Sequence, residues 1–248
     1  MRLFTHQVRG EQLLFWRSRE AAFFVFVFPL LLFVLVSSVY TGRIYGRPAS
    51  WALLAGLIGY GCANTAFAGL ALLIVGRREQ GILKRIRSTP LPPPTYLAAV
   101  LTSILAVFLL QVVALFLLGK ALRSTPFPDN VLSLLVVLLL GAAAFAGLGL
   151  AAASLIRSQE GSSAVLNVIL LPMAFLSGAF GPTRKYPEFL RAIGDVLPLK
   201  YLIDAIDAIY LHGRDLWSQR GAVAVLAAWG LAGVLVAWRY FRWEPREG

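Results

Sequence analysis

Long apolar stretches separated by short polar segments dominate this chain. Six of them are free of charged side chains in their interiors and cover residues 21–40, 52–75, 97–118, 131–156, 163–180 and 221–241. A helix needs about 20 residues to cross about 30 Å of hydrocarbon, and each stretch is close to that length. The pattern therefore predicts an all-α polytopic membrane protein with six transmembrane helices.

The segments at the two ends are more polar. Residues 1–20 mix apolar side chains with four arginines, which predicts a helix lying on the inner membrane surface; a frayed basic tail is the alternative. We expect this cytoplasmic segment to be followed by one membrane domain, residues 21–241, and by a short cytoplasmic tail, residues 242–248.

Residues 187–213, ahead of the last apolar stretch, do not have the composition of an ordinary loop. Leu199, Ile203, Ile206 and Tyr210 recur at helical spacing, while polar residues fall on another face. This pattern indicates amphipathic helices that lie in, or dip into, the outer membrane interface. A small surface subdomain packed on the spans is the alternative.

The charge distribution supports this topology. The chain is 58% hydrophobic, has a mean hydropathy of +0.74 and carries a net charge of +11. Because Lys and Arg stand at the ends of the apolar stretches, we attribute the excess to topology and to anionic lipid head groups, and predict no nucleic-acid partner. With both termini inside, the inner segments hold thirteen Lys and Arg and the short outer loops hold four. This bias predicts a multi-pass protein of the inner (cytoplasmic) membrane with cytoplasmic termini.

The usual signatures of an enzyme or an ion-coupled carrier are missing from the sequence. No segment fits the phosphate-binding pattern G-x-x-x-x-G-K-[ST], so we expect neither an ATP site nor another cofactor in this chain. His6 and His212 are predicted on opposite sides of the membrane, which argues against a metal site. Since the spans have no ionisable side chain in their interiors, uphill transport would require energy from another subunit. The rival function is an ATP-independent carrier or a membrane scaffold.

Three amide side chains interrupt the apolar stretches. Asn64, Gln111 and Asn167 each belong to a different predicted span. Two interpretations are open: the amides line a translocation path, or each one hydrogen-bonds a neighbouring helix.

Small residues form stripes at four-residue spacing in two of the spans. They are Gly61, Thr65 and Gly69 in the second span and Ala143, Gly147 and Ala151 in the fourth. Such stripes let helices approach closely, and we expect them to pack helices within the subunit; a dimer seam is the alternative. The single cysteine, Cys62, belongs to the same region and is interpreted as a small packing residue.

The loop after the second stretch, residues 77–92, carries an ordered motif. It resembles the E-x-G-x-L-x-x-[LI]-x-x-[TS]-P-L loop in the permease subunits of type-two ATP-binding-cassette (ABC) exporters, the drug and polysaccharide export class. The matching positions are Glu79, Gly81, Leu83, Ile86, Thr89, Pro90 and Leu91. Residues 175–178, 187–190 and 198–201 are similar to the F-L-S-G, P-x-x-L and P-L-x-Y segments of the same family, in the same order.

The resemblance implies a role for each of these segments. Residues 77–92 would form a coupling helix that docks on a separate cytoplasmic ATPase subunit, which binds ATP and Mg, with a lesser contact at residues 157–161. The implied coupling residues are Glu79, Gln80, Gly81, Ile82, Leu83, Lys84, Arg85, Arg157 and Glu160. Residues 1–20 would be a connecting helix, and residues 181–213 would contain short re-entrant helices near the outer exit. The implied residues of this outer gate are Phe175, Ser177, Pro187, Pro198 and Tyr201.

The resemblance also implies a transport subunit rather than an enzyme. Two such six-span subunits, identical or paralogous, would form a path through the membrane lipid. The apolar core and the lack of a large outer domain favour an amphipathic substrate such as a drug, a lipid or a hydrophobic peptide. A polysaccharide or glycolipid is the alternative substrate.

Overall fold

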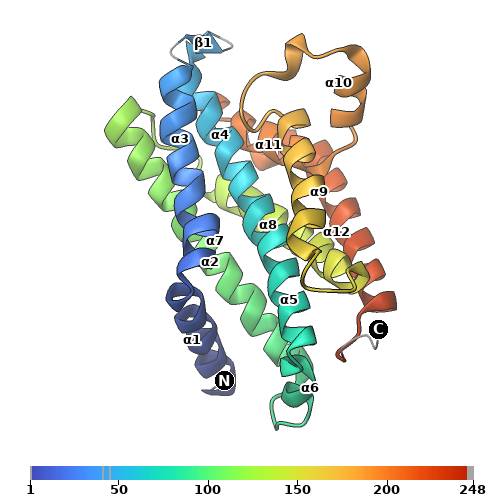
Figure 1. Cartoon of the computed structure of the whole chain (residues 1–248). Helices are drawn as coiled ribbons and strands as arrows, with labels where there is room; N and C mark the ends of the chain where they lie inside the picture. Colours follow the sequence, from blue (N-terminus) through green and yellow to red (C-terminus); the bar gives the residue numbers. More distant parts are fainter. Residues whose placement is uncertain (1, 41, 45, 245–248) are drawn as a thin grey trace.

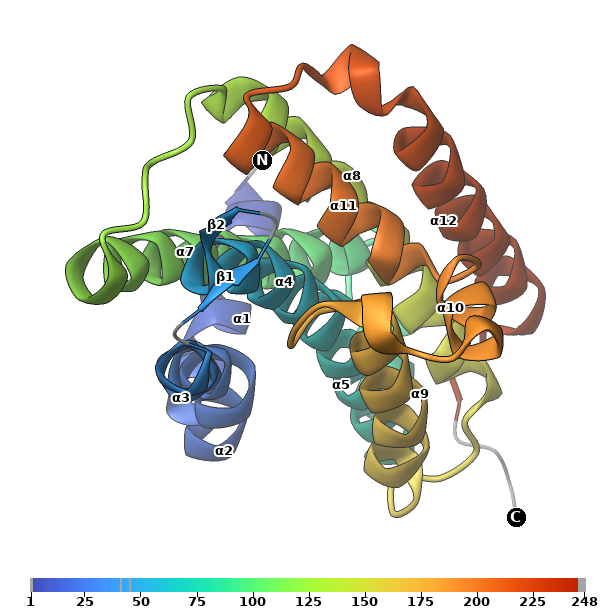
Figure 2. The ribbon, with the colours of Figure 1, turned by 90° about the horizontal axis from the view of Figure 1, so that it is seen from above.

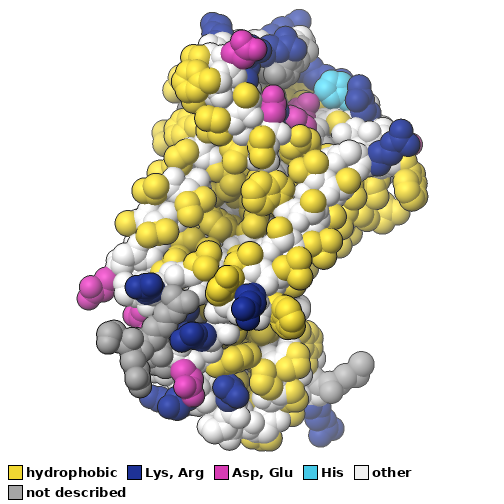
Figure 3. Space-filling model, turned by 90° about the vertical axis from the view of Figure 1, so that its right-hand side faces the viewer, with side chains coloured by type: hydrophobic (Ala, Val, Ile, Leu, Met, Phe, Trp, Pro, Cys, Tyr) yellow, Lys and Arg dark blue, Asp and Glu magenta, His cyan; other side chains and the backbone are white. Residues whose placement is uncertain are grey.

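The structure is a computed structural model that describes residues 2–40, 42–44 and 46–244, and within these ranges it is nearly all helical (Figure 1). The last four residues of the predicted cytoplasmic tail, 245–248, lie outside the described residues. On the face shown in Figure 3, apolar side chains cover the middle of the molecule, and Lys and Arg gather toward its two ends. This distribution is the one expected of a polytopic membrane protein.

Among the described residues, five helices are long and apolar enough to cross a membrane. The first two are composites: α2 (Arg19–Ala22), η1 (Phe23–Val27) and α3 (Phe28–Val39) run on as one helix, as do α4 (Ala49–Cys62), η2 (Ala63–Gly69) and α5 (Leu70–Glu79). The other three are α7 (Pro93–Arg123), α8 (Val131–Leu155) and α12 (Arg220–Tyr240), the last preceded by the short η4 (Leu216–Gln219).

The fifth predicted span is shorter than expected. Helix α9 (Ser162–Leu176) has 15 residues, which corresponds to about 22 Å. It stops four residues before the predicted boundary at residue 180, because the chain turns at Ser177 and Gly178, where Gly178 has a φ of +82°. The third span, in contrast, begins earlier than predicted. Helix α7 starts at Pro93 rather than residue 97, since proline is tolerated in the first turn of a helix.

The composite second span is the centre of the bundle. Viewed from above, α4 and α5 lie among the other long helices (Figure 2), and α4 contacts α3, α7 and α11. Its apolar side chains are buried on all sides; Leu54, Leu57, Ile58 and Cys62 have no exposed surface. Cys62 is thus a packing residue, as predicted.

Two π-helical segments face each other in the first and second spans. In η1 the backbone N–H of Phe28 bonds to the carbonyl of Phe23, five residues earlier. Segment η2 lies opposite, and the Asn64 amide donates to the Phe24 carbonyl at 3.1 Å. These segments were not predicted, because a π-helix has the same apolar composition as the α-helix around it.

Glycine allows α8 and α12 to pack closely. A Cβ on Gly233 would lie 2.6 Å from the backbone carbon of Gly147, and a Cβ on Gly147 would lie 2.7 Å from the Gly230 carbonyl. On another face of α8, a Cβ on Gly149 would lie 2.7 Å from the Ala66 carbonyl of η2. The small residue Gly147 therefore packs helices within the subunit, as predicted.

The predicted amphipathic segment forms α10 (Glu188–Gly194) and α11 (Pro198–His212), after the short η3 (Thr183–Lys185). Helix α11 contacts α4, α8 and α12, and in Figure 2 it crosses above the bundle. Leu199, Ile203, Ile206 and Tyr210 are all buried, as their spacing predicts. A two-stranded hairpin, β1 (Arg43–Ile44) and β2 (Arg47–Pro48), lies at the same end of the molecule.

Candidate coupling surface

The motif loop forms a tight turn and a short helix at the end of the molecule opposite α11 (Figure 1). Helix α5 ends at Glu79, and Gln80 and Gly81 make the turn into α6 (Ile82–Arg87). Gly81 has a φ of +69°, a left-handed conformation that glycine adopts without steric cost, and its N–H donates to the Arg78 carbonyl at 3.0 Å. The glycine of the motif is therefore required by the geometry of this turn.

Helix α6 is anchored by one side chain and otherwise projects outward. Leu83 is fully buried, whereas Lys84, Arg85 and Arg87 are exposed. The Thr89 hydroxyl donates to the Ile86 carbonyl at 2.7 Å, which closes the end of the helix before Pro90. The result is a small cationic projection, which we call the α6 projection (residues 82–87).

Arg78 ties the base of this projection to the end of α8. Its side chain is 1% exposed, and its guanidinium donates to the carbonyls of Ala153 and Ile156 at 2.7 and 2.5 Å. Carbonyls in the last turn of a helix lack helical partners, so a buried cation there stabilises the helix end. This role of Arg78 was not predicted, although Arg78 follows Ile74 and Val75 at helical spacing and so shares their buried face.

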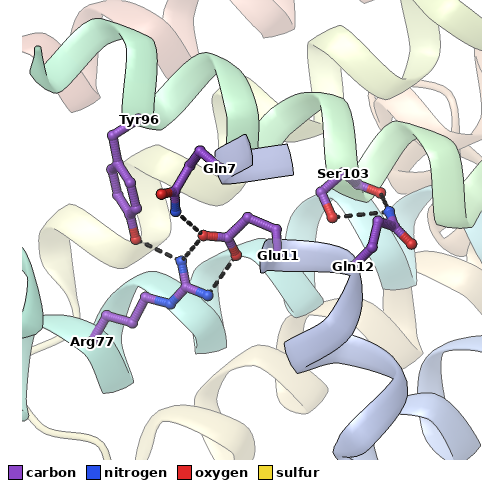
Figure 4. A network of polar contacts seen from close by, with 6 residues as sticks. All are labelled: Gln7, Glu11, Gln12, Arg77, Tyr96 and Ser103. Carbon is purple, nitrogen blue, oxygen red and sulfur yellow. Dashed lines mark hydrogen bonds and ion pairs between the residues drawn. The ribbon is translucent and has the colours of Figure 1, made fainter. Parts of the chain in front are cut away.

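Arg77, the neighbouring residue, ties the same helix to α1 (Arg2–Arg17) and α7 (Figure 4). Its guanidinium contacts both carboxylate oxygens of Glu11, at 2.9 and 2.6 Å, and donates to the Tyr96 hydroxyl at 2.6 Å. Gln7 donates to Glu11 at 2.8 Å, while Gln12 donates to the hydroxyl of Ser103 at 2.9 Å. Residues 2–17 of the segment predicted to be a connecting helix are helical. A bidentate ion pair between Arg77 and Glu11 joins this helix to α5.

The turn between α8 and α9 lies beside the same surface. Arg157 and Glu160 are exposed, and the Gln159 side chain lies within 3.5 Å of where a Cβ on Gly76 would be. Through Arg78 and this contact, the structure brings the two segments that carry the predicted coupling residues together at one end of the molecule.

The three amides predicted for a path have different surroundings. Asn64 bonds to the Phe24 carbonyl, and Asn167 is exposed on α9. Gln111 is fully buried, and a Cβ on Gly61 would lie 2.9 Å from its Oε1 atom. Neither amide atom of Gln111 has a hydrogen-bond partner within the described part of the chain. No hydrogen bond between described residues joins any two of these amides.

The comparison with known protein families decides the assignment. The family model described as ABC-2 type transporter matches residues 2–211. This chain belongs to the ABC-2 type transporter family. The match includes α1, the motif loop and α6, and it extends through all but the last residue of α11.

Relatives of this ABC-2 protein carry names of the same class. YvfS of Bacillus subtilis (strain 168), named as a transport permease, is 27% identical over 176 residues, which cover 70% of this chain and 69% of YvfS. YbhS of Escherichia coli (strain K12), named a probable multidrug ABC transporter permease, is 27% identical over 152 residues, covering 58% of this chain and 39% of YbhS. YhhJ of the same strain, named an inner membrane transport permease, is 24% identical over 159 residues, covering 60% of this chain and 42% of YhhJ.

The predicted outer-gate residues of this ABC-2 protein lie at the α11 end. The Phe175 and Phe180 rings pack edge to face with centroids 4.9 Å apart, and Ser177 is buried where α9 ends. Pro187 precedes α10 and Pro198 begins α11, which are positions where proline favours a helix start. The Tyr201 hydroxyl donates to the Asp195 carbonyl at 2.8 Å and links α11 to the end of α10. The described residues include no group of His, Cys, Asp and Glu side chains placed to hold a metal ion.

Proposed function

We propose that this chain is the transmembrane subunit of an ATP-driven exporter and that α6 docks on a separate cytoplasmic ATPase subunit. The α6 projection supports this proposal most directly. It carries three exposed cations, and the buried side chain of Leu83 anchors it. The preceding helix, α5, is joined to α8 by Arg78 and to α1 by Arg77. Membership of the ABC-2 family and the names of the relatives support it as well. ATP and Mg would be bound by that partner, and hydrolysis would occur there.

The proposal includes a topology. The α6 end, with both chain termini, faces the cytoplasm of the inner membrane, and the α11 end faces outward. In this topology, the contacts of α5 through Arg77 and Arg78 would transmit movement of α6 to other helices. A displacement of α6 by the ATPase would be transmitted through Arg77 to α1 and α7, and through Arg78 to α8, so several spans would shift together between inward-open and outward-open packings.

Two subunits are proposed to form the path, and the substrate is proposed to be amphipathic: a drug, a lipid or a hydrophobic peptide. Helix α9 supports this arrangement, because Asn167 lies on it beside Val168, which is 72% exposed. A polar side chain on an apolar face suits a second subunit and a path better than it suits lipid alone.

Copurification with the ATPase encoded nearest to this protein tests the docking proposal. Reversing two charges of α6, as Lys84→Glu with Arg85→Glu, should reduce the recovered ATPase by about tenfold, because the docking surface changes sign. Gly81→Pro should act similarly, since proline has neither the φ of +69° nor the N–H that bonds to Arg78. Arg214→Glu, an exposed cation at the α11 end, is the matched control. Equal recovery from all variants would refute docking through α6.

Cross-linking tests the subunit arrangement. Cys62 is fully buried, so a cysteine introduced at the surface reacts without background. Asn167→Cys should give a dimer with a short thiol cross-linker, whereas Val234→Cys, on the exposed apolar face of α12, should remain monomeric. The opposite pattern would place the second subunit against α12.

A further inference from the structure

A cavity of about 80 Å³ lies at the α11 end of the molecule, between three elements. Its walls come from the first turns of α4, from the turn after α9 and from one face of α11. It adjoins a wider cavity of about 480 Å³, and the two share Thr183, Lys200 and Asp204. The coupling surface lies at the opposite end of the molecule and uses none of these residues.

Two carboxylates from α11 line the small cavity. Asp204 and Asp207 are three residues apart and so lie on one face of the helix. Among the described residues, Asp204 forms no ion pair within 4 Å and no hydrogen bond through its side chain, whereas Asp207 lies 3.7 Å from Nδ1 of His212. The nearest cation on α11, Lys200, is paired with Asp195. The small cavity is therefore lined by two carboxylates, Asp204 and Asp207, and by one ammonium, that of Lys200, which is already paired with Asp195.

A third polar side chain lines the same cavity from the other wall. Ser177 is 4% exposed, and its hydroxyl has no hydrogen-bond partner in the described part of the chain. A buried hydroxyl without a partner costs free energy, so native structures retain one where a ligand or an ordered water supplies the partner. The hydroxyl and the carboxylates all accept hydrogen bonds, and they point to a ligand that donates several.

Beside these groups and the polar Thr183 and Lys200, part of the wall is apolar. Leu53 and Ile203 line the cavity, and Phe180, within the turn between Gly178 and Gly181, packs against Tyr60 and Phe175 with ring centroids 5.2 and 4.9 Å apart. Phe175 is 52% exposed. Apolar walls beside acceptors fit a head group that carries both a charge and a hydrocarbon chain.

We propose that this cavity binds the ammonium group of an amphipathic amine. The ammonium donates hydrogen bonds to the carboxylates of Asp204 and Asp207 and to the Ser177 hydroxyl, while its hydrocarbon part lies along the apolar wall. An ammonium suits the site better than a metal ion, because the described residues include no group of three possible metal ligands. This inference rests on the proposed function. It narrows the substrate class of the proposed exporter to amphipathic amines, which would bind on its outward-facing side.

Direct binding tests the proposal without the ATPase. The purified protein is placed in nanodiscs of phosphatidylglycerol, and binding of a fluorescent long-chain primary amine is compared with binding of the matching alcohol. The amine should bind at least about tenfold more tightly, since the ammonium carries a charge opposite to that of the carboxylates and donates more than one hydrogen bond. Asp204→Asn and Asp207→Asn should each weaken amine binding by about tenfold, and Ser177→Ala by a smaller factor. Asp129→Asn, which removes an exposed charge from another loop at the same end, should bind as the wild type does.

A second arm identifies the source of the ammonium. In nanodiscs that contain phosphatidylethanolamine, a lipid ammonium would compete with the amine and weaken its binding to the wild type; no competition would identify a soluble amphipath as the occupant. Equal binding of amine and alcohol, or wild-type binding by both Asn variants, would overturn the proposal. Loss of copurification in the α6 variants with amine binding intact would bear on the ATPase partnership alone, so the two proposals fail separately.

Discussion

The guanidinium of Arg78 donates to the carbonyl of Ala153, 75 residues later in the chain, at 2.7 Å. With the bond to the Ile156 carbonyl, it joins the end of the second span to the end of the fourth. The position is next to the turn that starts the coupling loop. The side chain thus connects the proposed docking surface to a helix that does not itself carry that surface.

Arg78→Lys should destabilise the protein by about 1–3 kcal/mol. The lysine ammonium cannot reproduce the two hydrogen bonds that the planar guanidinium donates to the Ala153 and Ile156 carbonyls. Thermal unfolding in detergent measures the change, and substrate-stimulated ATPase activity of the complex should fall with it. Arg85→Lys, at an exposed position on α6, is the control and should leave the unfolding midpoint unchanged. Equal midpoints for both variants would show that Arg78 contributes only charge.

The ion pair between Arg77 and Glu11 should show strong coupling in a double-mutant cycle. Arg77→Met leaves Glu11, which is 5% exposed, as an unpaired buried charge and should cost about 3–5 kcal/mol. The double variant Arg77→Met with Glu11→Leu should recover most of this loss, since no unpaired charge remains. Additive losses in unfolding experiments would mean that the two side chains stabilise the fold independently.

The close packing of α8 and α12 gives a third prediction. Gly233→Ala places a Cβ 2.6 Å from the Gly147 backbone, where neither helix yields without a shift, and should cost about 1–3 kcal/mol. Gly221→Ala, in the same helix with no atom within 4 Å of the new Cβ, should be neutral or slightly stabilising. Thermal midpoints of the two variants provide the comparison, and a smaller loss at Gly233 than at Gly221 would contradict the packing.

Asp204 should make stability depend on pH near neutrality. Burial raises its pKa to about 6, aided by Asp207 and Asp195 and opposed by Lys200. The folded state then holds the proton more tightly than the unfolded state, so this contribution is present at low pH and is lost as pH rises from about 4 through about 6. The wild type and Asp204→Asn should therefore unfold at similar temperatures at pH 5, and the wild type should unfold at a lower temperature at pH 7.5. If the difference in unfolding temperature between the wild type and Asp204→Asn stayed constant from pH 5 to pH 7.5, Asp204 would not be the group that titrates.

The sequence predicted those features that depend on local pattern. Charge-free stretches located the long helices, and helical spacing at Leu199 and Ile206 located α11 with its buried face. The motif marked Gly81 from the sequence, and the structure supplies the physical reason for a glycine there, a left-handed turn. In each case the information lies within a few residues of the position concerned.

Features that depend on contacts between distant segments were not predictable in the same way. Arg78 counted only as one more positive charge, because its partners lie 75 and 78 residues away. Gln111 was considered for a path, yet in this structure it packs on Gly61 with both amide atoms unpaired. The cavity at Ser177, Asp204 and Asp207 likewise exists only after α9 and α11 are brought together.

The two π-helical segments change the angular positions of side chains around the axes of the first and second spans. A π-helical turn contains more residues than an α-helical turn, so side chains before and after the segment follow different angular registers. In the second span, the half that leads to α6 is therefore rotationally offset from the half that packs beneath α11.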